Sequence, residues 1–221
     1  MKKEKNKPVN KAKTRFYLAA LLVAITASLL VYTCRQQIES PFTNAKRDIE
    51  AQRLSGKDWA SRIELPGLPN FHKISDELYR GAQPTKQGIE QLKKLGIKTI
   101  INLRSLNSDR DEIADSNFVY EHIYMKTWHP EDKEIIRFLQ IVTDKSNNPV
   151  FVHCRRGADR TGTMCAIYRI IVQGWSKQQA IEEMTKGGFG FNKIYINLIK
   201  YIEQLDTEKI KRSTNTPIIT N

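Results

Sequence analysis

Cysteine is scarce in this sequence, with three residues among 221, at positions 34, 154 and 165. So few cysteines exclude a disulfide-stapled fold. The sequence also lacks an internal repeat and a cluster of metal-ligating side chains, so we expect no bound metal and no other cofactor. We place Cys165 in the hydrophobic core. The chain length suits one domain large enough to bury its own core.

Acidic residues are nearly missing from the first fifteen positions, where Glu4 stands against seven lysines and arginines, a net of +6 out of +12 for the chain. No charged residue occurs from 16 to 34. A run of this length suits one membrane span of about 20 residues. The positive-inside rule predicts a basic cytoplasmic tail at 1–15, an anchor at 16–34 and an extracytoplasmic domain, periplasmic in a Gram-negative cell.

A cleaved signal peptide is the alternative for 16–34. Such peptides usually have a shorter apolar region and a small-x-small cleavage site, and no good site occurs around Ala24 to Ser28. Tyr32 and Thr33 make Cys34 a poor lipoprotein cysteine. We favour the uncleaved anchor and keep secretion to the periplasm after cleavage as the alternative. Because half of the net charge lies in the tail, and no basic helix with interleaved aromatics occurs, we expect no nucleic-acid partner.

The rest of the chain divides into a juxtamembrane stalk at 35–65, a folded domain at 66–206 and a flexible tail at 207–221. Within the domain, β-branched runs and helical periodicity alternate. This alternation predicts an α/β fold with a central, mostly parallel sheet flanked by helices. We expect strands at 78–80, 98–103, 118–125 and 150–153, and helices at 85–95, 131–144, after 160, from a Ser176/Gln179 capping box to Gly187, and at about 192–205.

One string carries the chemistry. His153-Cys154-Arg155-Arg156-Gly157-Ala158-Asp159-Arg160-Thr161-Gly162 follows an apolar strand and opens a helix. Backbone N–H groups in such a loop converge on an anion, and their dipoles with nearby arginines favour the thiolate form of Cys154. Arg160 can hold two phosphate oxygens bidentately. A buried structural cysteine is the ordinary alternative, but the whole string at a strand-to-helix junction favours a phosphate cradle with a sulfur nucleophile.

This string resembles the signature loop of the cysteine-dependent protein tyrosine phosphatases, in their dual-specificity-like branch. Residues 74–84 and 96–104 are similar to the opening of bacterial and fungal atypical dual-specificity phosphatases. The resemblance implies a two-step reaction through phosphocysteine, in which Cys154 is the nucleophile and Arg160, with the loop N–H groups, stabilises the equatorial charge. It implies that substrate is bound by Arg155, Arg156, Gly157, Ala158, Asp159 and Thr161.

Three further roles follow from the loop. The Thr161 hydroxyl can donate to the sulfur and improve it as a leaving group. Gly157 allows a backbone conformation with positive φ. His153 either orders the loop from behind or is a merely packed histidine.

A general acid must protonate the leaving oxygen, and we expect it on the loop 126–132. Trp128 and Pro130 resemble the tryptophan-proline-aspartate loop of tyrosine phosphatases. Asp132 is the first candidate, with His129 or Glu131 as substitutes. The two acidic residues would equally well favour a helix N-terminus electrostatically.

The sequence favours phosphotyrosine proteins as substrates, with phosphoserine and phosphothreonine also admitted. Arg155 and Arg156 place positive charge at the mouth, so an inositol (pyro)phosphate phosphatase is an alternative. Inositol phosphates are cytosolic, and an extracytoplasmic domain would not meet them. A catalytically weak phospho-binding module is a further alternative, although binding alone does not need both Cys154 and Arg160.

Overall fold

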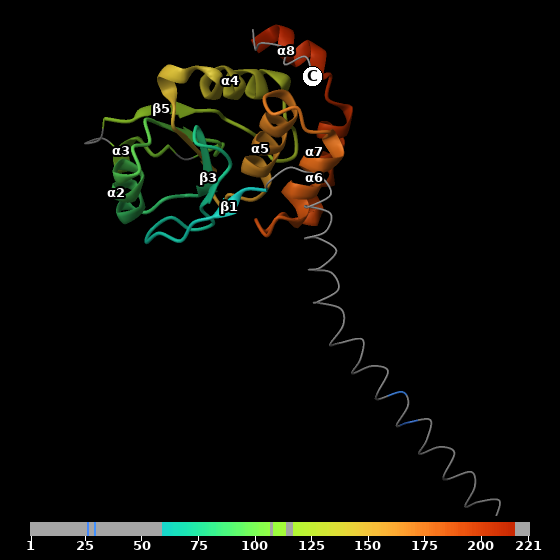
Figure 1. Ribbon diagram of the computed structural model, residues 1–221, viewed down its shortest axis with the longest axis horizontal. Coiled ribbons are helices and arrows are strands. Elements are labelled where there is room, and N and C mark those ends of the chain that lie inside the picture. Colours follow the sequence, from blue (N-terminus) through green and yellow to red (C-terminus); the bar gives the residue numbers. More distant parts are fainter. Residues whose placement is uncertain (1–25, 27–28, 30–58, 107, 114–116, 215–221) are drawn as a thin grey trace, which may run out of the picture. The chain divides into compact units, whose positions relative to one another are not determined.

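The computed structural model describes residues 59–106, 108–113 and 117–214, together with 26 and 29 (Figure 1). The basic tail, nearly all of the expected anchor and residues 35–58 of the expected stalk lie outside the described residues, as do residues 215–221. Within the part of the chain that is described, no helix is long and apolar enough to cross a membrane. The anchor at 16–34 therefore stays a prediction.

Strands and helices alternate along the described domain as the sequence predicts. In chain order they are β1 (Ser61–Arg62), β2 (His72–Lys73), β3 (Leu78–Ala82), α2 (Lys86–Lys94), β4 (Thr99–Asn102), α3 (Arg110–Ile113), β5 (Val119–His122), α4 (Asp132–Thr143), η1 (Lys145–Asn147), β6 (Val150–Cys154), α5 (Asp159–Ile171), α6 (Lys177–Lys186), η2 (Lys193–Tyr195), α7 (Ile196–Gln204) and α8 (Thr207–Thr214).

In the described residues the sheet has six strands in the order β1-β2-β3-β6-β4-β5. The pairs β3–β6, β6–β4 and β4–β5 are parallel, whereas β1 and β2 form an antiparallel edge. The α/β fold with a central sheet is thus confirmed, and the sheet is mixed. Strand β6 lies between β3 and β4, so its carboxyl end is flanked by both neighbours, where open α/β sheets place their ligands.

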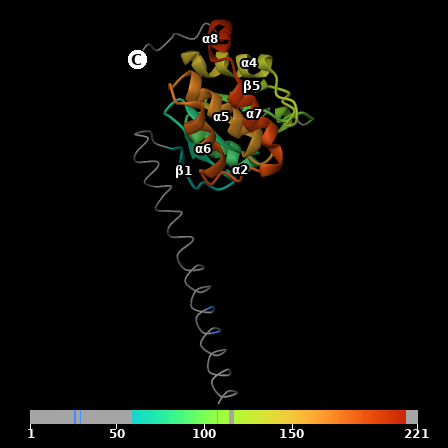
Figure 2. The same cartoon turned by 90° about the vertical axis from the view of Figure 1, so that its right-hand side faces the viewer.

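The two faces of the sheet carry separate hydrophobic cores because side chains alternate along each strand. Val150 and Val152 of β6 belong to a large core with helices α4 to α8, while Phe151 belongs to a smaller core with α2 and α3. Figure 1 shows α2 and α3 on the side of the sheet opposite to α5, α6 and α7, and in Figure 2 the group with α5, α6 and α7 faces the viewer. This alternation sends Cys154 toward the face that α5 covers.

Helix α5, which follows the loop, is buried on almost every side. The sequence predicts one inward face, with Met164, Ile167, Tyr168 and Ile171, and all four are buried. The opposite face is buried too, because α5 lies between the sheet and helices α4, α6 and α7. The N-terminus of α5 is therefore held rigidly beneath the loop that connects β6 to α5. The Ser176 capping box at the start of α6 is confirmed by both of its hydrogen bonds.

Two predicted boundaries are wrong. The folded domain begins before residue 66, since the Ala60 N–H donates to Oε1 of Glu183 over 2.7 Å and β1 pairs with β2. Residues 207–214 are helix α8 rather than a flexible tail, and Ile210 is only 1% exposed. Both segments are held by contacts with residues far away in the sequence, which a local pattern does not reveal.

Candidate active site

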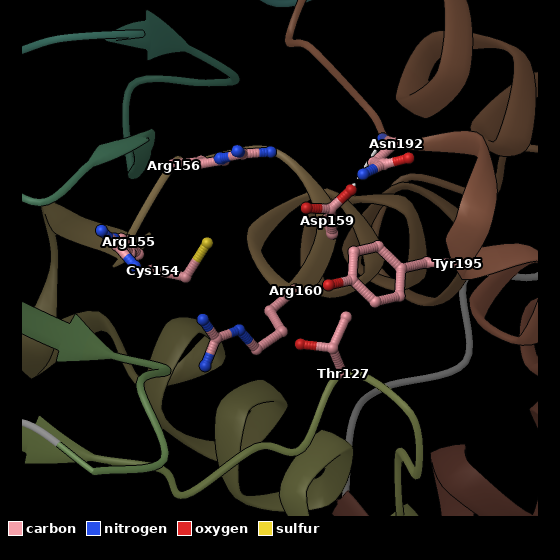
Figure 3. A pocket seen from close by; sticks show the side chains of 8 residues that line it. All are labelled: Thr127, Cys154, Arg155, Arg156, Asp159, Arg160, Asn192 and Tyr195. Atoms are coloured by element: carbon pink, nitrogen blue, oxygen red, sulfur yellow. Dashed lines mark hydrogen bonds between the residues drawn. The ribbon is translucent and has the colours of Figure 1, made fainter.

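Strand β6 ends at Cys154, and the residues after it wrap around a pocket of about 420 Å³ (Figure 3). Cys154 is only 2% exposed and its sulfur faces this pocket. The pocket brings together most of the charged residues that the sequence singles out. It is lined by Thr127, Cys154, Arg155, Arg156, Asp159, Arg160, Asn192 and Tyr195.

Hydrogen-bond donors behind the loop hold its carbonyl groups. The Gln83 N–H donates to the carbonyl of Arg155 over 3.4 Å, and the side-chain amide of Asn70 donates to that of Arg156 over 2.9 Å. The buried guanidinium of Arg80 donates to the carbonyl of Gly157 over 2.7 Å. None of these three donors lines the pocket. The carbonyl groups are therefore turned away from the cavity.

Because of the geometry of the peptide bond, the hydrogen bonds to the loop carbonyls create an anion site on the other side of the loop. In a trans peptide the C=O of one residue and the N–H of the next point in opposite directions. With the carbonyls of 155–157 held from behind, the N–H groups of Arg156, Gly157 and Ala158 are directed to the pocket side. Gly157 has φ +68°, as predicted, and a Cβ there would lie 2.3 Å from the carbonyl carbon of Gly81. The loop can thus pack against β3 only with glycine at this position.

Arg160 reaches from the first turn of α5 across the pocket floor. Its Nη1 donates to the carbonyl of Leu103 over 3.1 Å and to that of Met125 over 3.5 Å, which lie just beyond β4 and β5. These contacts fix the guanidinium beside Cys154 in Figure 3. The sheet therefore positions the charge before any ligand arrives.

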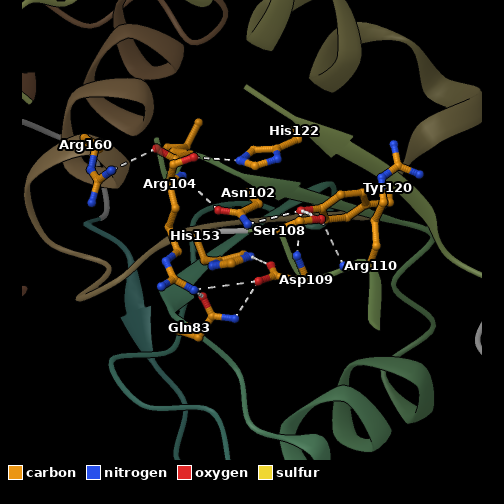
Figure 4. Close-up of polar contacts among 11 residues, drawn as sticks. Gln83, Asn102, Arg104, Ser108, Asp109, Arg110, Tyr120, His122, His153 and Arg160 are labelled. Carbon is orange, nitrogen blue, oxygen red and sulfur yellow. Dashed lines mark hydrogen bonds and ion pairs between the residues drawn. The ribbon is translucent and has the colours of Figure 1, made fainter. Parts of the chain in front are cut away.

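His153 lies beneath the loop in a buried polar network (Figure 4). Its Nε2 is 2.7 Å from Oδ2 of Asp109, and both side chains are almost fully buried. Gln83 donates to the other oxygen of Asp109 over 2.6 Å. Burial opposes ionisation of Asp109, yet contacts with His153 and Gln83 outweigh it and hold the pKa of that carboxyl below its usual value. This arrangement supports the interpretation of His153 as an organiser of the loop.

Comparison with known proteins agrees with this geometry. Residues 69–197 match a family model described as "DSP-PTPase phosphatase fused to NAD+ Kinase". Over 154 residues the chain is 32% identical to the dual specificity protein phosphatase TpbA of Pseudomonas aeruginosa, covering 69% of each chain. The chain belongs to the cysteine-dependent protein tyrosine phosphatase superfamily, in its atypical dual-specificity branch. It is a cysteine-based phosphatase.

Solved structures of relatives have a similar fold. The crystal structure of TpbA has a TM-score of 0.64 at 30% identity and covers 72% of this chain and 97% of that one. A TpbA variant has been solved in complex with phosphotyrosine, at 29% identity and with the same coverage. The chain is also 28% identical to the inositol diphosphatase DSP5 of Arabidopsis thaliana over 155 residues, covering 65% of this chain and 73% of that one.

The Thr161 hydroxyl, which the sequence predicts to donate a hydrogen bond to the Cys154 sulfur, has an unusual environment. The hydroxyl of Thr161 is fully buried and has no hydrogen-bond partner within the described residues. An unpaired buried hydroxyl costs about 1–3 kcal/mol. Thr161 follows Arg160 in the first turn of α5, close to Cys154 in the sequence. A donor kept for the sulfur would explain why this cost is tolerated.

The structure does not bring Asp132 into the pocket, which corrects its expected position. Asp132 begins α4, where Oδ1 accepts from the hydroxyl of Tyr201 over 2.8 Å and Oδ2 from Nζ of Lys209 over 2.6 Å. These hydrogen bonds hold the pKa of Asp132 below its usual value, so it stays ionised near neutral pH. Its contacts tie α4 to α7 and α8, and the carboxylate has no proton to give.

The two substitutes for Asp132 also lie outside the pocket lining. Glu131 immediately precedes α4 as its N-cap and pairs with Lys133 over 2.7 Å, which lowers its pKa. His129 is exposed. The loop 126–132 does reach the pocket, but through Thr127, whose carbonyl accepts from the Asn197 side chain over 2.8 Å.

Several residues of the site were missed from the sequence. Asn192 and Tyr195 line the pocket although they lie more than thirty residues after the loop. Asn70 and Arg80 hold the loop from strands and turns about eighty residues before it. The sequence did contain a signal for Arg80, because this residue lies on the same face of β3 as Leu78 and Ala82. An arginine on a buried face must have a partner.

Proposed function

We propose that this phosphatase hydrolyses phosphate monoesters of tyrosine in proteins through a phosphocysteine intermediate. The observation that carries the proposal is the loop whose carbonyls are tied down from behind while Cys154 and Arg160 face the pocket. Such a loop offers N–H donors to the equatorial phosphoryl oxygens as charge develops on them.

Cys154 attacks phosphorus as a thiolate in this proposal. The N-terminus of α5 and the three pocket arginines place positive charge around the sulfur. Arg160, held by backbone carbonyls on one side, presents its remaining N–H groups to two phosphoryl oxygens. Thr161 donates its hydroxyl to the sulfur when phosphocysteine is hydrolysed, which makes the thiolate a better leaving group.

The residues beside the pocket favour a peptide substrate. Trp128 is 70% exposed and follows Thr127, while Ile194 is 73% exposed and precedes Tyr195. Exposed apolar side chains next in sequence to the lining residues suit the ring of phosphotyrosine and flanking peptide groups rather than a polyphosphorylated ring. The phosphotyrosine complex of TpbA supports the same substrate class.

An inositol (pyro)phosphate is the second candidate, favoured by one observation. Arg155 and Arg156 are both exposed at the pocket mouth, where they could bind additional phosphates of one substrate. The relative named as an inositol diphosphatase is consistent with this chemistry.

The experiment uses the purified full-length protein with three substrates at equal concentration: a phosphotyrosine peptide, a phosphoserine peptide and an inositol pyrophosphate. We expect the highest kcat/KM on the phosphotyrosine peptide. Trp128→Ala should lower kcat/KM on that peptide and leave a small aryl phosphate unaffected. A higher kcat/KM on the inositol pyrophosphate would contradict the peptide proposal. So would an equal loss of kcat/KM in Trp128→Ala on the phosphotyrosine peptide and on the aryl phosphate.

We also infer that residues 16–34 anchor the phosphatase to a membrane and that the catalytic domain lies outside the cytoplasm. The uncharged run and the basic residues before it support this inference. The alternative is a protein released to the periplasm by cleavage of that segment.

A further inference from the structure

A phosphate monoester with a poor leaving group needs a proton donor, and the described residues that line the pocket include only one carboxyl group. Of the lining residues, Asp159 alone carries a carboxylic acid. The loop expected to deliver the acid contributes Thr127, whose hydroxyl is far too weak an acid to serve. Asp132 lies elsewhere, bound to Lys209 and Tyr201.

The surroundings of both carboxyl oxygens place Asp159 for proton transfer. It is the first residue of α5, directly before Arg160, and is 8% exposed. Its Oδ1 accepts the Asn192 N–H over 2.8 Å, while Oδ2 has no partner among the described residues. Figure 3 shows the carboxyl on the pocket wall beside Asn192 and Tyr195, across the opening from Cys154.

The segment that holds Asp159 is itself fixed. Asn192 caps η2, since its side chain accepts the Ile194 N–H over 3.1 Å. One carboxyl oxygen is therefore anchored to an ordered backbone and the other is left toward the cavity. A carboxylate that served only to fix this segment would not need to lie inside a phosphate pocket, where its charge opposes that of the substrate.

A carboxyl group that faces a reacting oxygen can give it a proton in one step and take a proton from water in the next. The Asp159 carboxyl lines the pocket in which the phosphoryl group would lie, so its position suits this exchange.

We propose that Asp159 is the general acid and base of the reaction, which rests on the proposed phosphocysteine mechanism. In the first step the sulfur–phosphorus bond forms, the bond from phosphorus to the leaving oxygen breaks, and the Asp159 proton moves to that oxygen. In the second step water bonds to phosphorus and its proton moves to Asp159. The sulfur–phosphorus bond then breaks and its electron pair returns to Cys154 as thiolate.

The test compares Asp159→Asn with the wild type, using the full-length protein. Asparagine keeps an oxygen for the Asn192 N–H but has no proton to exchange. We expect kcat for phenyl phosphate, whose phenol has a pKa near 10, to fall about 100-fold or more. For 2,4-dinitrophenyl phosphate, whose phenolate leaves unprotonated, formation of phosphocysteine should be almost unchanged. The alkaline limb of the kcat profile for phenyl phosphate should flatten.

A second readout does not depend on the leaving group. Because the variant lacks the base of the second step, phosphocysteine should accumulate when 2,4-dinitrophenyl phosphate is turned over. Equal losses of phosphocysteine formation with both substrates, or no accumulation, would overturn the proposal and leave Asp159 as an anchor for Asn192.

Asp132→Asn is run beside it as the competing assignment. A leaving-group dependence that appears in Asp132→Asn and not in Asp159→Asn would also overturn the proposal. Failure of the underlying mechanism would look different, because the wild type would then hydrolyse both substrates without forming phosphocysteine.

Discussion

Arg80 and Gly157 are separated by 77 positions in the sequence, yet the guanidinium of the first donates to the carbonyl of the second over 2.7 Å. Arg80 is almost fully buried, and its Cζ lies 3.8 Å from the centre of the Phe189 ring. A strand on one side of β6 thus holds the middle of the loop that follows β6. This contact turns a flexible, glycine-containing segment into a rigid phosphate cradle.

Replacement of this arginine tests its role in positioning the loop. Arg80→Lys keeps a positive charge but loses the planar group that reaches Gly157 and covers Phe189. We expect kcat/KM to fall about 100-fold, since a shift of about 1 Å in a reacting group costs that much. Binding of vanadate should weaken in parallel.

Arg62→Lys serves as the control for Arg80→Lys, because Arg62 is exposed on the edge strand β1, two strands away from β3. It should leave kcat/KM within a factor of about two. Normal vanadate binding by Arg80→Lys would show that the loop keeps its shape without the arginine.

A buried ion pair between α5 and α6 predicts a large effect on stability. Nε of Arg169 donates to Oε2 of Glu183 over 2.8 Å, and both side chains are 3% exposed. Glu183→Leu should lower the free energy of unfolding by about 3–5 kcal/mol, because it leaves the buried Arg169 charge unpaired. Denaturant unfolding followed by circular dichroism measures this difference. The double variant Arg169→Met/Glu183→Leu should recover much of the loss, and purely additive effects would contradict the account.

The network under the loop predicts an acid-sensitive contribution to stability. The folded-state pKa of Asp109 lies below its ordinary value of 3.8. Its ionisation therefore stabilises the fold above the unfolded pKa, and this stabilisation is lost as pH falls through the folded pKa. Asp109→Asn should lower stability at neutral pH and flatten the decline below about pH 4.

Unfolding curves measured from neutral pH to about pH 2 test this prediction. Asp111→Asn, exposed in helix α3 two residues after Asp109, is the matched control and should keep the wild-type decline. The same acid slope in Asp109→Asn and in the wild type would show that the contact with His153 does not favour the ionised form.

The membrane inference has its own test. A reporter that is active only outside the cytoplasm, fused after residue 221, should be active, and the full-length protein should stay with membranes after a salt wash. Leu22→Lys with Ile25→Lys should prevent insertion, at a cost of about 3 kcal/mol for each charge near the centre. Recovery of a shortened, soluble protein from the outer compartment would show that the segment is cleaved.

The local parts of the site were predictable from the sequence. The apolar strand before Cys154, the helix after Arg160 and the positive φ of Gly157 all follow from short-range rules on periodicity, anion binding and backbone sterics. These rules fail where a residue's role depends on distant partners. Arg80 resembles any strand residue until its contact with Gly157 is seen, and Ile210 lies on a helix too short to stand out.

The general acid shows the same limit. Sequence spacing placed Asp132 on the expected loop, but position along the chain does not fix which way a carboxyl group points. The contacts with Lys209 and Tyr201 come from helices α8 and α7, about seventy residues later. Asp159 was identified as part of the loop, and only the pocket geometry distinguishes it from the other loop residues.

The most direct test of the whole account is detection of the covalent intermediate. The full-length protein is mixed with an aryl phosphate, quenched rapidly under denaturing conditions and digested for mass spectrometry. Cys165→Ser is the matched control, because burial raises the pKa of that thiol to about 11 and keeps it unreactive. We predict one phosphoryl group on the peptide that contains Cys154, retained in Cys165→Ser and absent, together with turnover, in Cys154→Ser. A folded Cys154→Ser variant that still hydrolyses the substrate, or a phosphoryl group on any other residue, would contradict the mechanism.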